Sequence, residues 1–221
     1  MIALTLKQAL NFSLTMLPIV AGAVIAAWRY RALAPNLRPL AWLTWFELPL
    51  EILAIVLQLQ QRNNLFIMPL YTVGELTLLA LLYRRTLRQA AFGRLVPWLV
   101  GGFAAYTLFD SLLAQDLLWF RPGQQIIQSL LLLSMAGLYF RQLLNDLQVK
   151  RLSREPIFWV SIGLVLYFVG YLNIALFSNY MLRHYSLQFN RNIWAINSGL
   201  AIVLHCCYCV ALGLRQPAAR G

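Results

Sequence analysis

The chain has 221 residues, of which 61% are hydrophobic and only 11% are charged. A soluble domain carries about 25% charged residues, so this composition excludes a soluble protein with an ordinary water-exposed surface. The formal net charge of +11 would suit a nucleic-acid partner, but the basic residues stand in short groups between long apolar segments, and this distribution excludes nucleic-acid binding.

Seven long apolar segments follow one another along the chain, each close to the ~20 residues that span a bilayer as a helix. They predict one all-helical domain over residues 1–221, a polytopic membrane protein folded as a bundle of seven transmembrane helices. The predicted helices cover residues 10–28, 40–59, 65–83, 95–113, 124–140, 157–177 and 193–214. The first segment also resembles a signal-peptide core, but it continues to Trp28, so we expect a retained helix.

The 18 basic residues divide unequally between the two ends of these helices. Thirteen stand between the first and second, third and fourth, and fifth and sixth helices, and after the seventh: Arg29, Arg31, Arg38, Arg84, Arg85, Arg88, Arg94, Arg141, Lys150, Arg151, Arg154, Arg215 and Arg220. The other five are Lys7, Arg62, Arg121, Arg183 and Arg191. Cytoplasmic loops carry the excess of Lys and Arg, which predicts an outside N-terminus and a cytoplasmic C-terminus in a bacterial inner (cytoplasmic) membrane. The basic loops should then face anionic lipid head groups.

Four of the seven acidic residues fall within predicted helices: Glu47, Glu51, Glu75 and Asp110. A charged side chain in the middle of a membrane costs about 2.5–3.5 kcal/mol even on the most lenient scale. No Lys or Arg lies at matching depth, so we expect these acids to have no counter-charge within the chain. They should therefore be protonated, since burial and mutual repulsion disfavour the charged form, or face a hydrated cavity or a bound cation.

The three glutamates predict one ligand- or proton-binding site inside the bundle. The predicted helices 40–59 and 65–83 are joined by a short turn, which brings their glutamates together, and Tyr71 lies one helical turn from Glu75 on the same face. The predicted site residues are Glu47, Glu51, Glu75, Tyr71, Asn173, Asn197 and His205. The alternative is that each acid is a neutral, hydrogen-bonded packing residue. Asp110 is expected to be structural or to lie at a hydrated outer mouth.

Several other functions are disfavoured by missing residues. The "HCCYC" run at 205–209 has metal-ligand spacing, but a closed zinc site needs four ligands and the only other histidine, His184, is predicted in a loop. The two lysines, Lys7 and Lys150, lie outside the predicted helices, which excludes a covalent retinal protein. One intramembrane histidine is too few for a haem protein or a zinc hydrolase. We therefore predict no catalytic residues, no metal and no cofactor.

Three stretches carry a family resemblance: "NNLFIMPLYTVGELTLLALLY" (63–83), "EPIFWVSIGLVLYFVGYL" (155–172) and "NIWAINSGLAIVLHCCYCVALGL" (192–214). They resemble a group of small bacterial seven-helix integral membrane proteins that have no established activity. The chain departs from the group's pattern at Pro69, where relatives have a histidine. The resemblance implies a membrane sensing module that works beside signalling proteins. The positions that match its pattern are Asn63, Asn64, Tyr71, Glu75, Phe158, Trp159 and Trp194.

These observations predict a non-enzymatic, receptor-like membrane sensor. It would bind a proton or a small or lipophilic ligand at the carboxylate site and signal through a cytoplasmic or membrane partner, because no loop is large enough for an output domain. A small proton- or cation-coupled transporter or channel is the first alternative. A structural subunit of a larger membrane complex is the second. In each case the expected surroundings are membrane lipids.

Overall fold

The computed structural model describes residues 6–113, 121–146 and 152–214, and no strand occurs within these ranges. Seven of the helices are long and apolar enough to cross a membrane. This confirms the prediction of an all-helical chain with seven such segments. The long helices are α1 (Leu6–Arg29), α2 (Arg38–Leu59), α3 (Met68–Thr86), α4 (Ala90–Leu113), α5 (Pro122–Asp146), α6 (Pro156–His184) and α7 (Leu187–Gly213). Three short 3₁₀ helices lie beside them: η1 (Tyr30–Ala32), η2 (Leu65–Ile67) and η3 (Leu152–Arg154).

Several helices are longer than the apolar segments that predicted them. The largest difference is at the turn between α6 and α7, where α6 continues about two turns beyond residue 177 and ends at His184. The prediction that His184 lies in a loop is therefore wrong, because it is the last residue of α6. The helix α7 then begins directly, because the Ser186 hydroxyl accepts a hydrogen bond from the Phe189 backbone N–H at 3.2 Å. Such an N-cap satisfies a backbone donor that the helix leaves free.

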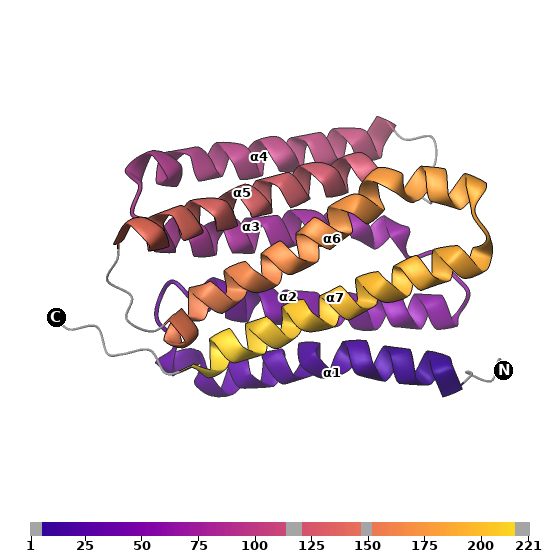
Figure 1. The fold of residues 1–221 in the computed structure, drawn as a ribbon, viewed down its shortest axis with the longest axis horizontal. Coiled ribbons are helices and arrows are strands. Elements are labelled where there is room, and N and C mark those ends of the chain that lie inside the picture. Colours follow the sequence, from indigo (N-terminus) through magenta and orange to yellow (C-terminus); the bar gives the residue numbers. More distant parts are fainter. Residues whose placement is uncertain (1–5, 114–120, 147–151, 215–221) are drawn as a thin grey trace.

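Six of the helices form a closed ring, and the seventh lies outside it (Figure 1). Around the ring, α1 packs on α2, α2 on α3, α3 on α5, α5 on α6 and α6 on α7, and α7 packs back on α1. The helix α4 packs mainly on α3, at the edge of the bundle. The chain enters α1 at one end of the bundle and leaves α7 at the other. The ring therefore has an interior to which six helices contribute side chains.

The side chains are arranged with large apolar residues on both the inside and the outside of this ring. Leu40, Leu79, Leu132 and Leu164 are completely buried between the helices. On the outside, large side chains such as Trp28 remain mostly uncovered, at 88% exposed. The interior also holds polar side chains, and the buried ones include Thr44, Glu47, Glu75, Gln128, Ser161 and His205.

Candidate functional site

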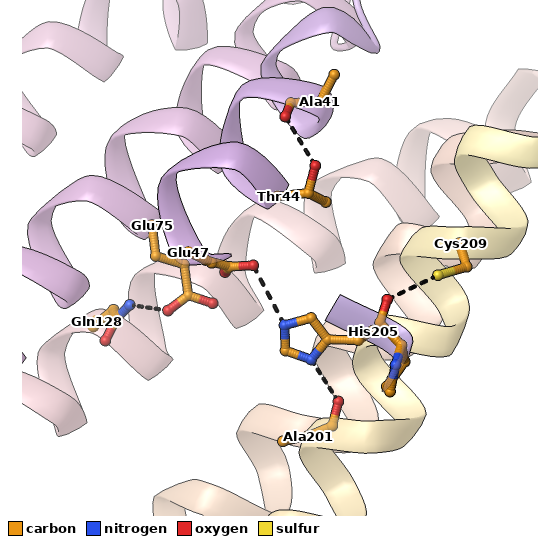
Figure 2. Close-up of polar contacts among 9 residues, drawn as sticks. Ala41, Thr44, Glu47, Glu75, Gln128, Ala201, His205 and Cys209 are labelled. Carbon is orange, nitrogen blue, oxygen red and sulfur yellow. Dashed lines mark hydrogen bonds and ion pairs between the residues drawn. The ribbon is translucent and has the colours of Figure 1, made fainter. Parts of the chain in front are cut away.

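The candidate site lies inside the ring, where four helices bring polar side chains together (Figure 2). Glu47 comes from α2, Glu75 from α3, Gln128 from α5 and His205 from α7. All four are buried, and Glu47 is only 1% exposed. In Figure 2 the two carboxyl groups lie next to each other, with Gln128 on one side and His205 on the other. The structure thus brings Glu47, Glu75 and His205 together, as the predicted site requires.

His205 uses both of its ring nitrogens, one to reach α2 and one to bond its own helix α7. Its Nε2 lies 3.3 Å from Glu47 Oε2, and its Nδ1 lies 2.7 Å from the backbone oxygen of Ala201, one turn back on the same helix. The Ala201 carbonyl oxygen is only an acceptor, so Nδ1 must carry a proton to bond it. The other Glu47 oxygen, Oε1, is buried and has no hydrogen-bond partner within the described chain.

Glu75 is bonded by Gln128, a residue outside the predicted site. The Gln128 amide nitrogen donates a hydrogen bond of 2.7 Å to Glu75 Oε2, and this contact joins α5 to α3. A buried carboxyl group needs such donors, because an unsatisfied one loses its hydration without replacement. The signal that could have found Gln128 is the run of Gln124, Gln125 and Gln128 at the start of an otherwise apolar helix.

Glu51 and Tyr71 lie at the edge of this cluster and are half-buried. Glu51 is one turn from Glu47 on α2 and interacts electrostatically with Glu47 and His205. The Tyr71 hydroxyl interacts electrostatically with all three glutamates. Within the described residues, neither Glu51 nor Tyr71 forms a side-chain hydrogen bond to the cluster. The three predicted glutamates and the tyrosine therefore share one region of the bundle.

The two predicted asparagines differ in position. Asn197 on α7 faces inward and its side chain reaches the Tyr167 hydroxyl on α6, while its own Oδ1 is buried without a partner in the described chain. Asn173 on α6 is exposed, and its amide nitrogen donates to the Val169 backbone oxygen of the same helix at 2.7 Å. The structure therefore places Asn197 near the cluster and Asn173 away from it.

Asp110 does have a counter-charge, contrary to the expectation for the acids within helices. Arg121 Nη1 lies 3.1 Å from Asp110 Oδ2, and the Gln124 amide nitrogen donates to the same oxygen at 2.7 Å. The expectation failed because Asp110 lies near the end of α4, where Arg121, the loop residue directly before α5, reaches it. These contacts fasten α4 to α5, and they are separate from the cluster.

The histidine and cysteines of the "HCCYC" run point to different neighbours. His205 faces Glu47, the Cys209 thiol lies 3.2 Å from the Pro18 backbone oxygen of α1, and Cys206 is exposed. Among the described residues, no group of three or more His, Cys, Asp or Glu side chains is arranged to hold a metal ion.

The chemistry of this site is that of protonatable groups that contact each other in the buried interior of the ring. A carboxyl group and an imidazole share a hydrogen bond, and two further carboxyl groups interact with them electrostatically. No family model, no curated protein and no solved structure matches this chain. The resemblance drawn from three stretches of the sequence therefore stays a prediction, and the case for a function rests on the geometry of the cluster.

Proposed function

We propose that this protein is a non-enzymatic membrane sensor that responds to protonation of the Glu47–His205 pair and signals through a partner protein. The seven long apolar helices and their uncovered outer side chains support an integral membrane bundle. The excess of arginine at the end of the bundle where α7 finishes supports a cytoplasmic position for that end, and with it an outside N-terminus in a bacterial inner membrane. We call this the arginine-rich end; the arginines there include Arg29, Arg38, Arg84, Arg85, Arg88, Arg141 and Arg154.

The observation that carries the proposal is that both ring nitrogens of His205 form hydrogen bonds. Its hydrogen bonds to Ala201 and Glu47 need two protons, because the Ala201 oxygen can only accept. They are supplied either by an imidazolium beside a carboxylate or by a neutral imidazole beside a protonated Glu47. When one proton leaves, a single proton remains for two bonds. His205 then loses its link either to Glu47 or to its own helix.

This loss would change how α7 sits in the ring. The helices α2 and α7 touch at few other places, so the Glu47–His205 bond is the main polar contact between them. Near the arginine-rich end, Arg29 Nη1 donates to the Leu212 backbone oxygen at 2.7 Å and joins α1 to α7. A shift of α7 therefore reaches the end of the bundle that faces the cytoplasm in this proposal, where a signalling partner would bind.

The direct test is infrared difference spectroscopy of the purified protein at two pH values, which detects the C=O band of a protonated carboxyl group and the ring band of an imidazolium. We expect one of these two bands to depend on pH and to be lost or reduced in Glu47→Gln. Asp110→Asn is the matched control, because Asp110 lies outside the cluster, and it should leave the band unchanged. A wild-type protein in which neither a carboxyl group nor an imidazole titrates would contradict the proposal.

The same protein in liposomes separates a sensor from a transporter. A sensor titrates without moving protons across the membrane, so a pH-sensitive dye inside the liposomes should record no flux above that of empty liposomes. Proton flux that Glu75→Gln abolishes would instead favour proton-coupled transport, the first alternative.

A further inference from the structure

Tyr208 is a buried tyrosine whose hydroxyl group the cluster leaves without a partner. It lies one turn after His205 on α7, and the two rings pack edge to face with centroids 5.7 Å apart. Its side chain is completely buried, and its hydroxyl forms no hydrogen bond within the described chain. Buried tyrosines usually find a partner for this group, so this position calls for an explanation.

The groups that face Tyr208 place it between the cluster and the arginine-rich end. It interacts electrostatically with Glu47 of α2, with Glu75 and Tyr83 of α3, and with Tyr167 of α6. Tyr83 follows Glu75 by eight residues on the same face of α3, about 12 Å further toward the arginine-rich end. Tyr208 therefore has the carboxyl groups on one side and another buried hydroxyl on the other.

The series of buried hydroxyl groups continues from Tyr83 to the end of the bundle. The Tyr83 and Ser161 hydroxyls are 2.8 Å apart, and both side chains are fully buried. Tyr83 also interacts electrostatically with the buried Tyr139 of α5, which in turn interacts with Glu155 directly before α6. Hydroxyl and carboxyl groups thus lead from the cluster to the surface at the arginine-rich end.

Packing alone explains only part of this series. The Tyr83–Ser161 bond joins α3 to α6, and such interhelical bonds stabilise membrane bundles modestly. Tyr208 gains nothing comparable, since phenylalanine would fill the same volume without burying an unpaired hydroxyl. A role in proton transfer would explain why Tyr208 keeps its hydroxyl group.

We propose that Tyr208, Tyr83 and Ser161 form the route by which the carboxyl cluster exchanges protons with the arginine-rich end. Water bridges those hydroxyls that do not touch. At each step a hydroxyl or water oxygen accepts a proton on a lone pair and releases its own proton to the next oxygen. One proton moves and every group regains its covalent structure. The inference rests on the proposed function and adds the side from which the sensor reads pH.

The test measures how fast the cluster takes up a proton. Wild type and variants are placed in lipid nanodiscs, a light-activated caged acid lowers the pH, and the carboxyl or imidazolium infrared band that titrates in wild type is followed in time. Tyr208→Phe should slow the rise of the band about tenfold or more and leave its final amplitude unchanged. Tyr83→Phe should do the same. Tyr208→Phe loses no hydrogen bond to the protein, so it is expected to fold even if Tyr83→Phe does not.

Tyr171→Phe is the matched control, because Tyr171 is a buried tyrosine of α6 that lies ten residues, about 15 Å, further from the arginine-rich end than Ser161. Its rate should equal that of wild type. Equal rates in all variants would contradict the proposed proton route but not the proposed function of the cluster. A slow rate in Tyr171→Phe alone would do the same. If neither a carboxyl band nor an imidazolium band titrates in wild type, the proposed function fails, and the route has no cluster to serve.

Discussion

His205 and Glu47 are 158 residues apart in the sequence, and their side chains are 3.3 Å apart in the interior of the ring. The bond brings the last helix to the second helix, although these two helices share little other contact. The Nδ1 proton of His205 is used in the hydrogen bond to the Ala201 oxygen, so the hydrogen bond to Glu47 depends on a second proton. A structural contact between two helices is therefore also a protonation-dependent one.

Glu47→Gln should make this contact independent of pH. A glutamine amide donates to the neutral Nε2 of His205 while Nδ1 keeps its bond to Ala201, so both bonds persist when no extra proton is bound. Wild type loses one of them as the pH rises, at a cost of about 1 kcal/mol. The thermal midpoint in detergent should therefore fall less in the variant than in wild type between mildly acidic and mildly alkaline pH. Parallel curves would contradict this, and Asp110→Asn should keep the wild-type slope.

Gln128→Leu should destabilise the protein by about 1–3 kcal/mol, since it leaves the buried Glu75 carboxyl without its donor. Unfolding by SDS in mixed micelles measures this loss. Adding Glu75→Leu should recover most of it, because replacing both partners with apolar groups is nearly neutral. Ser134→Ala on the same helix is the control, since its exposed hydroxyl bonds only the Leu130 carbonyl oxygen of its own helix. A double variant no more stable than Gln128→Leu would show that Gln128 acts through packing.

The long helices and the inward position of Glu47 and Glu75 could be predicted because both follow from the cost of removing charge from water. Length and hydropathy defined the seven segments. The same cost required the glutamates to point into the bundle, and His205 was a suitable donor because few polar groups lie at that depth. These conclusions need no knowledge of how each helix is rotated about its axis.

The partners of these residues could not be predicted, because they depend on that rotation. The helix α6 is apolar on nearly every side, so its sequence does not tell which face is inward, and Asn173 was placed at the site although it is exposed. Gln128 was missed for a related reason, since a neutral amide raises no question of solvation. The ring order, with α5 beside α3 and α4 outside, is likewise absent from a hydropathy pattern.

Gly163→Ala should weaken the packing of α6 against α7. An added Cβ at Gly163 would lie 2.8 Å from the Cβ of Cys207, an atom that the α7 backbone holds in place. Relieving the overlap requires the helices to separate, which costs about 1–3 kcal/mol. Gly199→Ala on α7 is the control, because its added Cβ meets nothing within 4 Å and alanine favours a helix. Equal SDS unfolding midpoints for the two variants would contradict the close approach.

Asp110 and Arg121 should show a measurable coupling, since the Arg121 side chain is 14% exposed and the Asp110 side chain 36%. A double-mutant cycle with Asp110→Asn and Arg121→Gln should give about 0.5–1 kcal/mol, the value of a partly exposed ion pair. The coupling should shrink at high salt, because screening weakens exposed charges. Additive effects of the two single variants would mean that Gln124, and not Arg121, holds the Asp110 carboxylate.

In the proposed function the orientation of the bundle decides which compartment the cluster reads, and two matched glutamines test it. Gln60 at the end of α2 and Gln89 before α4 are both exposed and lie at opposite ends of α3. In a chain whose Cys206, Cys207 and Cys209 are replaced by alanine, Gln60→Cys should react with a membrane-impermeant maleimide on intact bacterial cells. Gln89→Cys should react only after the cells are permeabilised, because the positive-inside rule places the loops rich in arginine in the cytoplasm. The reverse labelling pattern would mean that the arginine-rich end faces outward, so that protons passing Tyr83 and Tyr208 would report external pH. Labelling of both sites on intact cells would contradict a membrane crossing by α3.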